Sequence, residues 1–288
     1  MQHYPQPALY LVATPIGNLA DISLRALHVL QLVDTIACED TRHSQALLRA
    51  YGIDKAGSAL LALHQHNELE AAQLVVARLR GGQRVAYVSD AGTPAISDPG
   101  ARLVATVRDA GLGVVSIPGA SSVTAALSVA GCMGQNEDGG FVFAGFLPPK
   151  LAERTTRVAA LAMEPRAAVL LEAPHRINDL AQALAALGER PLTVARELTK
   201  QFEAITTMPA ATFASWLAQD ANRSRGEFVV VLHPVQVAAP DSVDTRALAL
   251  LLPELPLKTA VRLAAEITGQ PRNALYAAAL ALKAQETR

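Results

Sequence analysis

A short apolar run that ends abruptly in small polar residues recurs along this 288-residue chain, and it constrains the fold more than any other feature. The clearest copy is VAYV at 85–88, which leads directly into SDAGTPAISDPG at 89–100. Apolar runs bounded by Gly, Pro and Asp are typical of buried strands. Further copies stand at 8–13, 35–38, 60–63, 114–117, 141–146, 168–171, 192–195 and 228–232. Because helical segments such as 68–79 separate many of these runs, the pattern predicts an α/β protein.

The loop after 85–88 is the first candidate for a ligand site. In an open parallel sheet the loops at the carboxyl ends of strands line the crevice that binds small molecules. The polar groups placed there are Asp90, Gly92, Thr93, Ser97 and Asp98. A plain turn and helix cap explains part of the loop, because Asp98 and Pro99 suit the start of a helix over 101–110. It leaves 89–93 unexplained, so we favour a ligand site.

Two other strand ends carry glycine-containing loops. The segment TPIGN at 14–18 lacks the GxGxxG pattern, which disfavours a dinucleotide pyrophosphate site. The segment PGASS at 118–122 enters a helix and offers backbone N–H groups and the hydroxyls of Ser121 and Ser122. Such a helix start suits a carboxylate or phosphate, although ordinary serine capping explains the same residues.

Three charged clusters follow strands. The segment EDTRH at 39–43 is either a site or a solvated first helical turn capped by Asp40. The other two are EAPHR at 172–176 and RELTK at 196–200. The HxH of HQHNE at 64–68 lacks a third ligand of known position, so it predicts a loop that caps the following helix and no metal site.

Composition narrows the functional class. With 51% hydrophobic and 18% charged residues, the chain has enough core for two packed domains. The formal net charge of -1 excludes a generally basic nucleic-acid-binding surface and leaves room only for a local patch. The two cysteines, Cys38 and Cys132, form neither a disulfide framework nor a CxxC pair, which fits a reducing cytoplasm. We find no signal peptide and no apolar run long enough to span a membrane.

The C-terminal segment has a pattern of its own. Amphipathic helices are expected at 257–268 and 273–284, and the break between them at 269–271 contains a glycine. This spacing fits a helix-turn-helix. The basic residues here outnumber Glu266 and Glu286; they are Lys258, Arg262, Arg272, Lys283 and Arg288. Nucleic-acid contact and a hairpin used only for packing both remain open.

Nine motifs together carry a family resemblance: LYLVATPIGNLADIS, CEDTRHS, HQHNE, VSDAGTPAISDPG, IPGAS, GFLP, LLEAPHRI, ARELTKQFE and GEFVVVL. In this order the chain resembles the S-adenosylmethionine-dependent methyltransferases of the tetrapyrrole-methylase-like class. More narrowly it is similar to the ribosomal RNA branch, which methylates the ribose 2'-oxygen of a cytidine in small-subunit (16S) ribosomal RNA. The resemblance spans nearly the whole chain and is most specific in the TPIGN, EDTRH and SDAGTPAISDPG runs.

The resemblance implies two α/β domains, 1–130 and 131–240, with a cofactor cleft between them, and a helical extension at 241–288. It also implies a cytoplasmic homodimer that binds 16S ribosomal RNA in the small subunit. The residues expected to contact S-adenosylmethionine are Pro15, Asp90, Gly92, Thr93, Ser121, Ser122, Leu171 and Glu227. The expected substrate-binding residues are Arg42, His43, Arg176 and Lys200, and the candidate general bases are Glu172 and Asp40.

Two other functional classes stay open at this point. A methyltransferase acting on a tetrapyrrole or a diphthamide precursor would share the core and have less need for a basic helical tail. A DNA-binding regulator would use the tail for binding and the α/β part as a ligand sensor. Cofactor binding separates the regulator from both enzymes, and methyl transfer to small ribosomal subunits separates the two enzymes.

Overall fold

The computed structural model describes residues 4–64, 66–97, 99–133, 140–235 and 245–286, with the side chains of 281 and 283–286 excepted. The chain divides into two compact units, Met1–Val235 and Gln236–Arg288. Asp98 lies outside the described residues, as do the segments 134–139 and 236–244.

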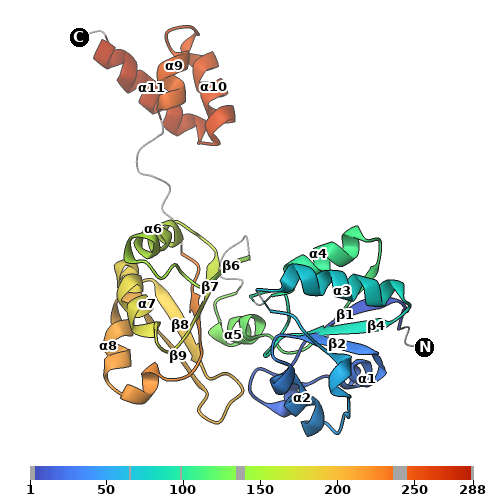
Figure 1. Ribbon diagram of the computed structural model, residues 1–288. Coiled ribbons are helices and arrows are strands. Elements are labelled where there is room, and N and C mark those ends of the chain that lie inside the picture. The colour runs from blue at the N-terminus through green and yellow to red at the C-terminus, as the bar shows by residue number, and fades with distance from the viewer. Residues whose placement is uncertain (1–3, 65, 98, 134–139, 236–244, 287–288) are drawn as a thin grey trace. The chain divides into compact units, whose positions relative to one another are not determined.

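The first sheet of the larger unit is entirely parallel, with the order β3-β2-β4-β1-β5. Its strands are β1 (Ala8–Val12), β2 (Thr35–Cys38), β3 (Leu60–Ala62), β4 (Arg84–Val88) and β5 (Gly113–Ile117). One face packs against α1 (Leu24–Leu32) and α2 (Thr41–Ala50), and the other against α3 (Glu68–Arg80) and α4 (Ala101–Asp109) (Figure 1). Because helices cover both faces, the central strands are largely apolar, which confirms the predicted parallel α/β pattern.

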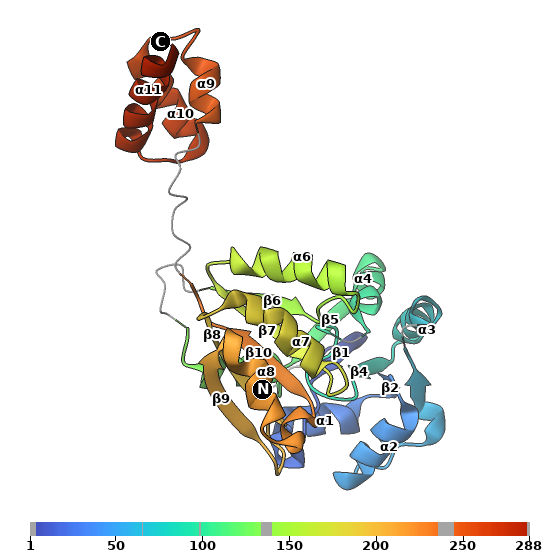
Figure 2. The same cartoon turned by 90° about the vertical axis from the view of Figure 1, so that its left-hand side faces the viewer.

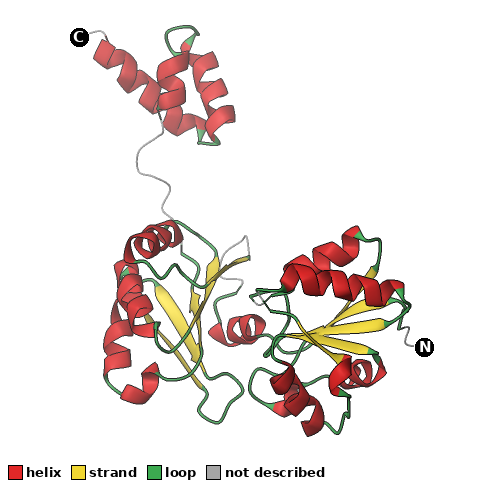
Figure 3. Ribbon diagram, viewed as in Figure 1, coloured by secondary structure: helices red, strands yellow, loops and turns green. Residues whose placement is uncertain are grey.

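The second sheet is mixed, with the order β6-β7-β10-β8-β9. Only β6 and β7 are parallel neighbours; the other three pairs are antiparallel. Its strands are β6 (Phe141–Gly145), β7 (Ala167–Glu172), β8 (Pro191–Arg196), β9 (Ala204–Pro209) and β10 (Phe228–Leu232). Figure 3 shows the two groups of strands and the helices that cover them, consistent with the predicted two α/β domains.

Different helices cover the two faces of the second sheet, which forms the second half of the larger unit. On one face lie α6 (Leu151–Ala162), α7 (Ile177–Leu184) and α8 (Phe213–Ala218) (Figure 2), and their apolar residues form a hydrophobic core with the sheet. The other face packs against α5 (Ser122–Ala130), which directly follows the first sheet. Helix α5 therefore joins the two halves of the unit.

Pairing of β10 with both β7 and β8 brings three chain segments to one edge of the second sheet. Phe228, at the start of β10, stands opposite Glu172 at the end of β7 and opposite Arg196 at the end of β8. The segment before an antiparallel strand therefore reaches the same edge as the segments after its neighbours. This arrangement places Glu227 beside the carboxyl ends of β7 and β8.

The smaller unit consists of α9 (Arg246–Leu251), α10 (Leu257–Thr268) and α11 (Arg272–Glu286). They bury a core of their own, made by Leu248, Leu252, Ala260, Val261, Ala264, Leu275 and Ala279. Gly269 ends α10 with a φ of 70°, a left-handed conformation that favours glycine. The two predicted helices and their glycine break are confirmed, and α9 is an additional helix that the periodicity did not predict. Within the described ranges, no helix is both long and apolar enough to cross a lipid bilayer.

Candidate active site

Hydrogen bonds join the three loops that follow β1, β4 and β5. Thr14 N donates to Gly92 O at 2.9 Å, and Gly92 N donates back to Thr14 O at 3.1 Å. The Thr14 hydroxyl donates to Ser89 O at 3.2 Å, and the Thr93 hydroxyl donates to Ala120 O at 3.0 Å. Because each loop is bound to a neighbour, the carboxyl edge of the first sheet presents a fixed surface.

Glycine is needed at position 92 for this arrangement. Gly92 has a φ of 84°, and a Cβ there would lie 3.2 Å from Ile16 Cγ2. A side chain would strain the backbone and crowd the neighbouring loop. The SDAGTP segment thus brings the β4 loop into close contact with the loop after β1.

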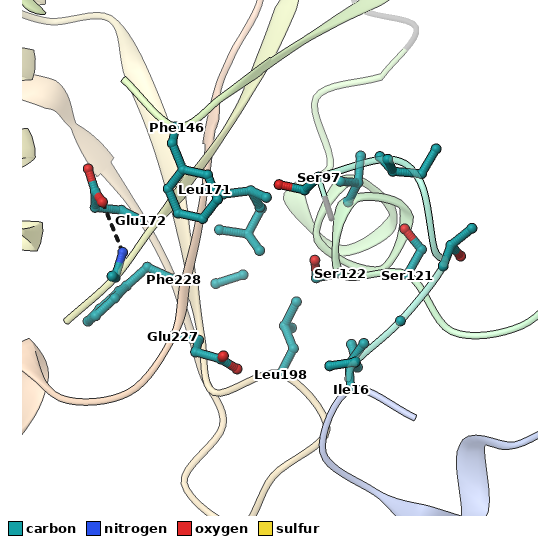
Figure 4. Close-up of a pocket in the computed structure, with 18 of the residues that line it drawn as sticks. Ile16, Ser97, Ser121, Ser122, Phe146, Leu171, Glu172, Leu198, Glu227 and Phe228 are labelled. Carbon is teal, nitrogen blue, oxygen red and sulfur yellow. Dashed lines mark hydrogen bonds between the residues drawn. The ribbon is translucent and has the colours of Figure 1, made fainter. Parts of the chain in front are cut away.

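A cavity of about 370 Å³ lies between these loops and the edge of the second sheet (Figure 4). Its size falls in the range of small-molecule sites. Of the eight residues expected to contact a cofactor, seven line it: Asp90, Gly92, Thr93, Ser121, Ser122, Leu171 and Glu227. Pro15 is absent from the lining, whereas its neighbour Ile16 is present. The structure therefore brings together residues from both halves of the larger unit.

The charged residues that line the cavity are all acidic. Asp90, Glu172 and Glu227 are among its lining residues, and no lysine, arginine or histidine is among the described residues that line it. Much of the remaining lining is apolar, including Ile16, Val123, Leu171 and Val229. Carboxylates in a partly apolar cavity stabilise positive charge, so the cavity favours a ligand with a cationic group.

Glu227 is held by an ion-pair network that crosses two loops. Lys200 Nζ lies 2.9 Å from both Glu227 Oε2 and Glu197 Oε1, and Glu227 N donates to Glu197 Oε1 at 2.9 Å. Burial acts to raise the pKa of Glu197, but the hydrogen bonds from Lys200 and from the Glu227 amide outweigh it and lower that pKa. Lys200, expected to bind phosphate, is thus paired with two carboxylates; its role toward RNA stays a prediction.

Lys200 also contacts the loop after β1. A Cβ on Gly17 would lie 2.4 Å from Lys200 Cγ and 2.9 Å from Thr199 Oγ1. Thr199 and Glu197 both have positive φ values, 68° and 52°, which side-chain-bearing residues seldom adopt. The RELTK segment is therefore a strained loop that packs tightly on TPIGN beside the cavity.

Family comparison identifies the α/β part of the chain. Residues 8–214 match the family described as Tetrapyrrole (Corrin/Porphyrin) Methylases. The chain belongs to the tetrapyrrole methylase family. Residues 238–283 of this methylase match a second family, the RsmI C-terminal HTH domain. The expected methylase fold and helix-turn-helix-like extension are thereby confirmed.

Two curated relatives of this methylase are named Ribosomal RNA small subunit methyltransferase I. The one from Pseudomonas aeruginosa is 48% identical over 280 residues, covering 94% of this chain and 96% of the relative. The one from Escherichia coli O157:H7 is 48% identical over 279 residues, covering 96% of this chain and 95% of the relative. The expected assignment to the methyltransferases is confirmed.

A solved structure shares the fold of the α/β part. Uroporphyrin-III C-methyl transferase from Thermus thermophilus, complexed with S-adenyl homocysteine, gives a TM-score of 0.53 at 18% identity. The match covers 78% of this chain and 96% of that chain. At this identity the likeness concerns the fold alone.

Asp40 caps a helix of the methylase. Its carboxylate accepts a hydrogen bond from Arg42 N at 2.8 Å at the start of α2, and Arg42 Nη2 lies 3.0 Å from Asp40 Oδ2. Hydrogen bonding from the Arg42 side chain lowers the pKa of Asp40 to about 2. The capping interpretation is confirmed. Neither Asp40 nor the exposed pair Arg42 and His43 is among the residues that line the cavity.

Glu172 lines the cavity, but its carboxylate is engaged elsewhere. The side chain is 1% exposed, and Oε1 lies 3.2 Å from Arg176 Nε and accepts a hydrogen bond from Ala173 N at 2.9 Å. Arg176 also donates to Leu147 O. Leu171 and Glu172 point to opposite faces of β7, and Figure 4 shows the Glu172 carboxylate directed away from the centre of the cavity.

This placement favours a positioning role for Glu172, and a Glu172→Gln variant separates that role from general base catalysis. We expect the free energy of unfolding to fall by about 2 kcal/mol, because a partly buried Arg176 loses its counter-ion. Urea denaturation measures the loss, and Glu153→Gln, at an exposed ion pair with Lys150, is the matched control. With saturating cofactor, the single-turnover methyl-transfer rate should stay near wild type. A hundredfold slower chemical step in a stable variant would instead identify Glu172 as the base.

Several lining residues were not predicted as site residues. Phe146, Ile96, Leu198 and Phe228 reach the cavity from the ends of strands or from the adjoining loops. The available signal was their position: Phe146, Leu198 and Phe228 lie at or near predicted strand ends, and Ile96 lies in the loop predicted to bind a ligand. Among the described residues, no group of three or more His, Cys, Asp or Glu side chains could hold a metal ion.

Proposed function

We propose that this methylase transfers the methyl group of S-adenosylmethionine to the ribose 2'-oxygen of a cytidine in small-subunit ribosomal RNA. The observation that carries the proposal is the cavity, whose described lining includes the carboxylates of Asp90 and Glu227 and no cationic side chain. The third lining carboxylate, Glu172, is paired with Arg176 and directed away from the cavity centre. A sulfonium cofactor with an ammonium group fits that charge, whereas a phosphate-rich cofactor does not. The name shared by the two relatives supports ribosomal RNA as substrate, and the bound S-adenyl homocysteine of the fold neighbour supports the cofactor.

The cofactor, when bound, supplies a methyl group that is already electrophilic, and we assign the protein the task of alignment. Asp90 and Glu227 accept hydrogen bonds from the cationic and hydroxyl groups of the cofactor. Ser121 and Ser122, at the start of α5, present hydroxyl and N–H groups to its carboxylate. The ribose oxygen would be held in line with the carbon–sulfur bond. Its bond to the methyl carbon would form as the carbon–sulfur bond breaks, S-adenosylhomocysteine would leave, and the hydroxyl proton would pass to water.

On the substrate side, we assign phosphate contact to Arg42, whose side chain is 90% exposed, and to the exposed His43 beside it. Arg176 and Lys200 hold carboxylates of the site, so we assign them positioning in addition to any contact with RNA. We propose the small ribosomal subunit as the form in which the RNA is bound, in keeping with the name of the relatives, and the cytoplasm as the place of the reaction. We also propose that the protein acts as a homodimer.

Methyl transfer to isolated small ribosomal subunits tests this function. Subunits from cells that lack the protein should accept labelled methyl groups in its presence, and nuclease digestion should release the label as 2'-O-methylcytidine. Label found on a base, or transfer only to a tetrapyrrole, would refute the assignment. The matched control is subunits from wild-type cells, whose target is already methylated.

Cofactor affinity tests the site itself. We expect Asp90→Ala to weaken S-adenosylmethionine binding roughly tenfold or more, the effect of losing a hydrogen bond to a charged group. Asp90 is exposed, so the variant should fold normally. Calorimetric titration measures the affinity, and Asp109→Ala, an exposed carboxylate at the end of α4 outside the cavity lining, is the control. Equal affinities for wild type and Asp90→Ala would remove this loop from the cofactor site.

A further inference from the structure

Phe146 is an aromatic side chain displayed at the rim of the cavity. It is 51% exposed although it lines the cavity, and its neighbour Leu147 is 2% exposed. Figure 4 shows the ring beside Leu171 at one end of the cavity, and Ile16, Leu198 and Glu227 at the other. An apolar ring left half in water at a binding site is typical of a contact surface for a ligand.

The backbone holds this ring in a defined place. Gly145 has a φ of 64°, and the register of β6 against β7 shifts between Phe143 and Gly145. A bulge of this kind redirects the next side chain out of the strand pattern. Phe146 therefore leaves the sheet and turns toward the cavity.

Two arginines then fix the segment that follows. Arg176 donates to Leu147 O, and Arg154 Nη1 donates to Pro149 O at 3.2 Å. The Arg154 side chain is only 7% exposed and pairs with Asp179 at 3.4 Å, while Arg176 is held by Glu172. These hydrogen bonds from two ion-paired arginines therefore fix the backbone directly after Phe146.

A second exposed apolar side chain, Ile96, lies on the loop that follows β4 of the first sheet. Ile96 lines the cavity, is 57% exposed and follows Ala95, whose φ is 65°. A positive φ at alanine is strained, so this loop too is held in an uncommon conformation. Two exposed apolar groups thus reach the same cavity from opposite halves of the unit.

We propose that Phe146 is the stacking platform for a nucleobase of the RNA substrate, with Ile96 contributing apolar contact from the other half. The proposal rests on the proposed function and adds how the target nucleotide is held. A ribose inside the cavity requires that its base leave the RNA stack, and proteins bind such unstacked bases on aromatic rings. A half-exposed ring at the rim suits a base that remains attached to RNA outside the cavity. A small cofactor would instead be largely enclosed by its site.

Kinetics on small ribosomal subunits provide the first test. Phe146→Ala should raise the KM for the subunit roughly tenfold, the loss expected from one base–aromatic stack, while its Kd for S-adenosylmethionine stays unchanged. Phe146→Tyr should restore the wild-type KM. Phe141→Ala, at an exposed aromatic residue of the preceding strand β6 outside the cavity lining, is the matched control. An unchanged KM for Phe146→Ala overturns the proposal, and so does a weakened cofactor Kd with an unchanged KM.

Fluorescence supplies a test that is independent of turnover. Trp216 is the only tryptophan of the sequence, so a Trp216→Phe, Phe146→Trp variant reports from the rim alone. We expect quenching when a cytidine-containing single-stranded oligoribonucleotide is added in the presence of S-adenosylhomocysteine, and none with S-adenosylhomocysteine alone. Quenching by S-adenosylhomocysteine alone, or none with the oligonucleotide, contradicts base stacking. If the wild type methylates no ribosomal subunit, the proposed function fails whatever this signal shows.

Discussion

The Gly226→Ala variant is expected to unfold at a much lower urea concentration than the wild type and to bind S-adenosylmethionine weakly. Gly226 has a φ of 85°, and a Cβ there would lie 2.3 Å from Glu197 Cγ and 2.4 Å from Glu197 Cδ. The left-handed backbone alone costs alanine about 1–2 kcal/mol. Expelling Glu197 also breaks the network that holds Lys200 and Glu227, so we expect a total loss of roughly 3 kcal/mol or more.

Gly111→Ala is the matched control for this prediction. Gly111 has a φ of 73° in the same unit, and a Cβ there would meet nothing within 4 Å. The two variants share the backbone strain and differ in the contact with Glu197. Urea denaturation and calorimetric titration should therefore separate them clearly. Equal losses of stability and cofactor affinity would show that the Glu197 network does not organise the site.

A chain that ends at Val235 is expected to bind the cofactor with wild-type affinity and to lose most activity on small ribosomal subunits. The removed unit has its own hydrophobic core, so its absence leaves the core clusters of the α/β unit complete. It carries Lys258, Arg262 and Arg272, of which the two arginines share Glu266. Losing these cations should lower kcat/KM at least roughly tenfold and reduce the dependence of binding on salt.

Charge variants of the full-length chain separate RNA contact from other roles of this unit. Lys258→Gln combined with Arg262→Gln removes two charges on exposed positions of α10 and leaves its buried residues in place. We expect an intermediate loss of kcat/KM on subunits and a smaller salt slope. Wild-type activity of both the double variant and the truncated chain would assign the helices a packing role only.

The strands of the first sheet could be predicted because each is marked by a short apolar segment of the sequence. Strands β1 and β2 are covered by helices on both faces, so β1 is an unbroken apolar run in the sequence and β2 is apolar after Thr35. The second sheet was less predictable. Strand β9 lies at a sheet edge, where only Met208 is buried, and two threonines interrupt its apolar residues, so the sequence AITTMP was not predicted as a strand. The antiparallel insertion of β10 between β7 and β8 depends on long-range pairing that no local pattern records.

The same division holds for the candidate site. Residues at the ends of parallel strands, such as Asp90 and Thr93, line the cavity as the α/β pattern predicted. What each charge does depends on partners that are distant in sequence. Lys200 meets Glu227 only because β8 pairs with β10, and the alternation along β7 turns Glu172 away from the cavity centre. Residue type and strand-end position predicted where these groups lie, and tertiary pairing decided what they contact.

The separate core of the helical unit has a consequence for how such an enzyme changes over evolutionary time. Sites that share no contacts usually contribute additively to free energy, and the helical core shares no residue with the cluster that includes α5. A substitution that alters target choice through the helices therefore leaves the chemistry of the cavity unperturbed, and the reverse also holds. Selection can tune which RNA is modified and how fast the methyl group moves as two independent traits.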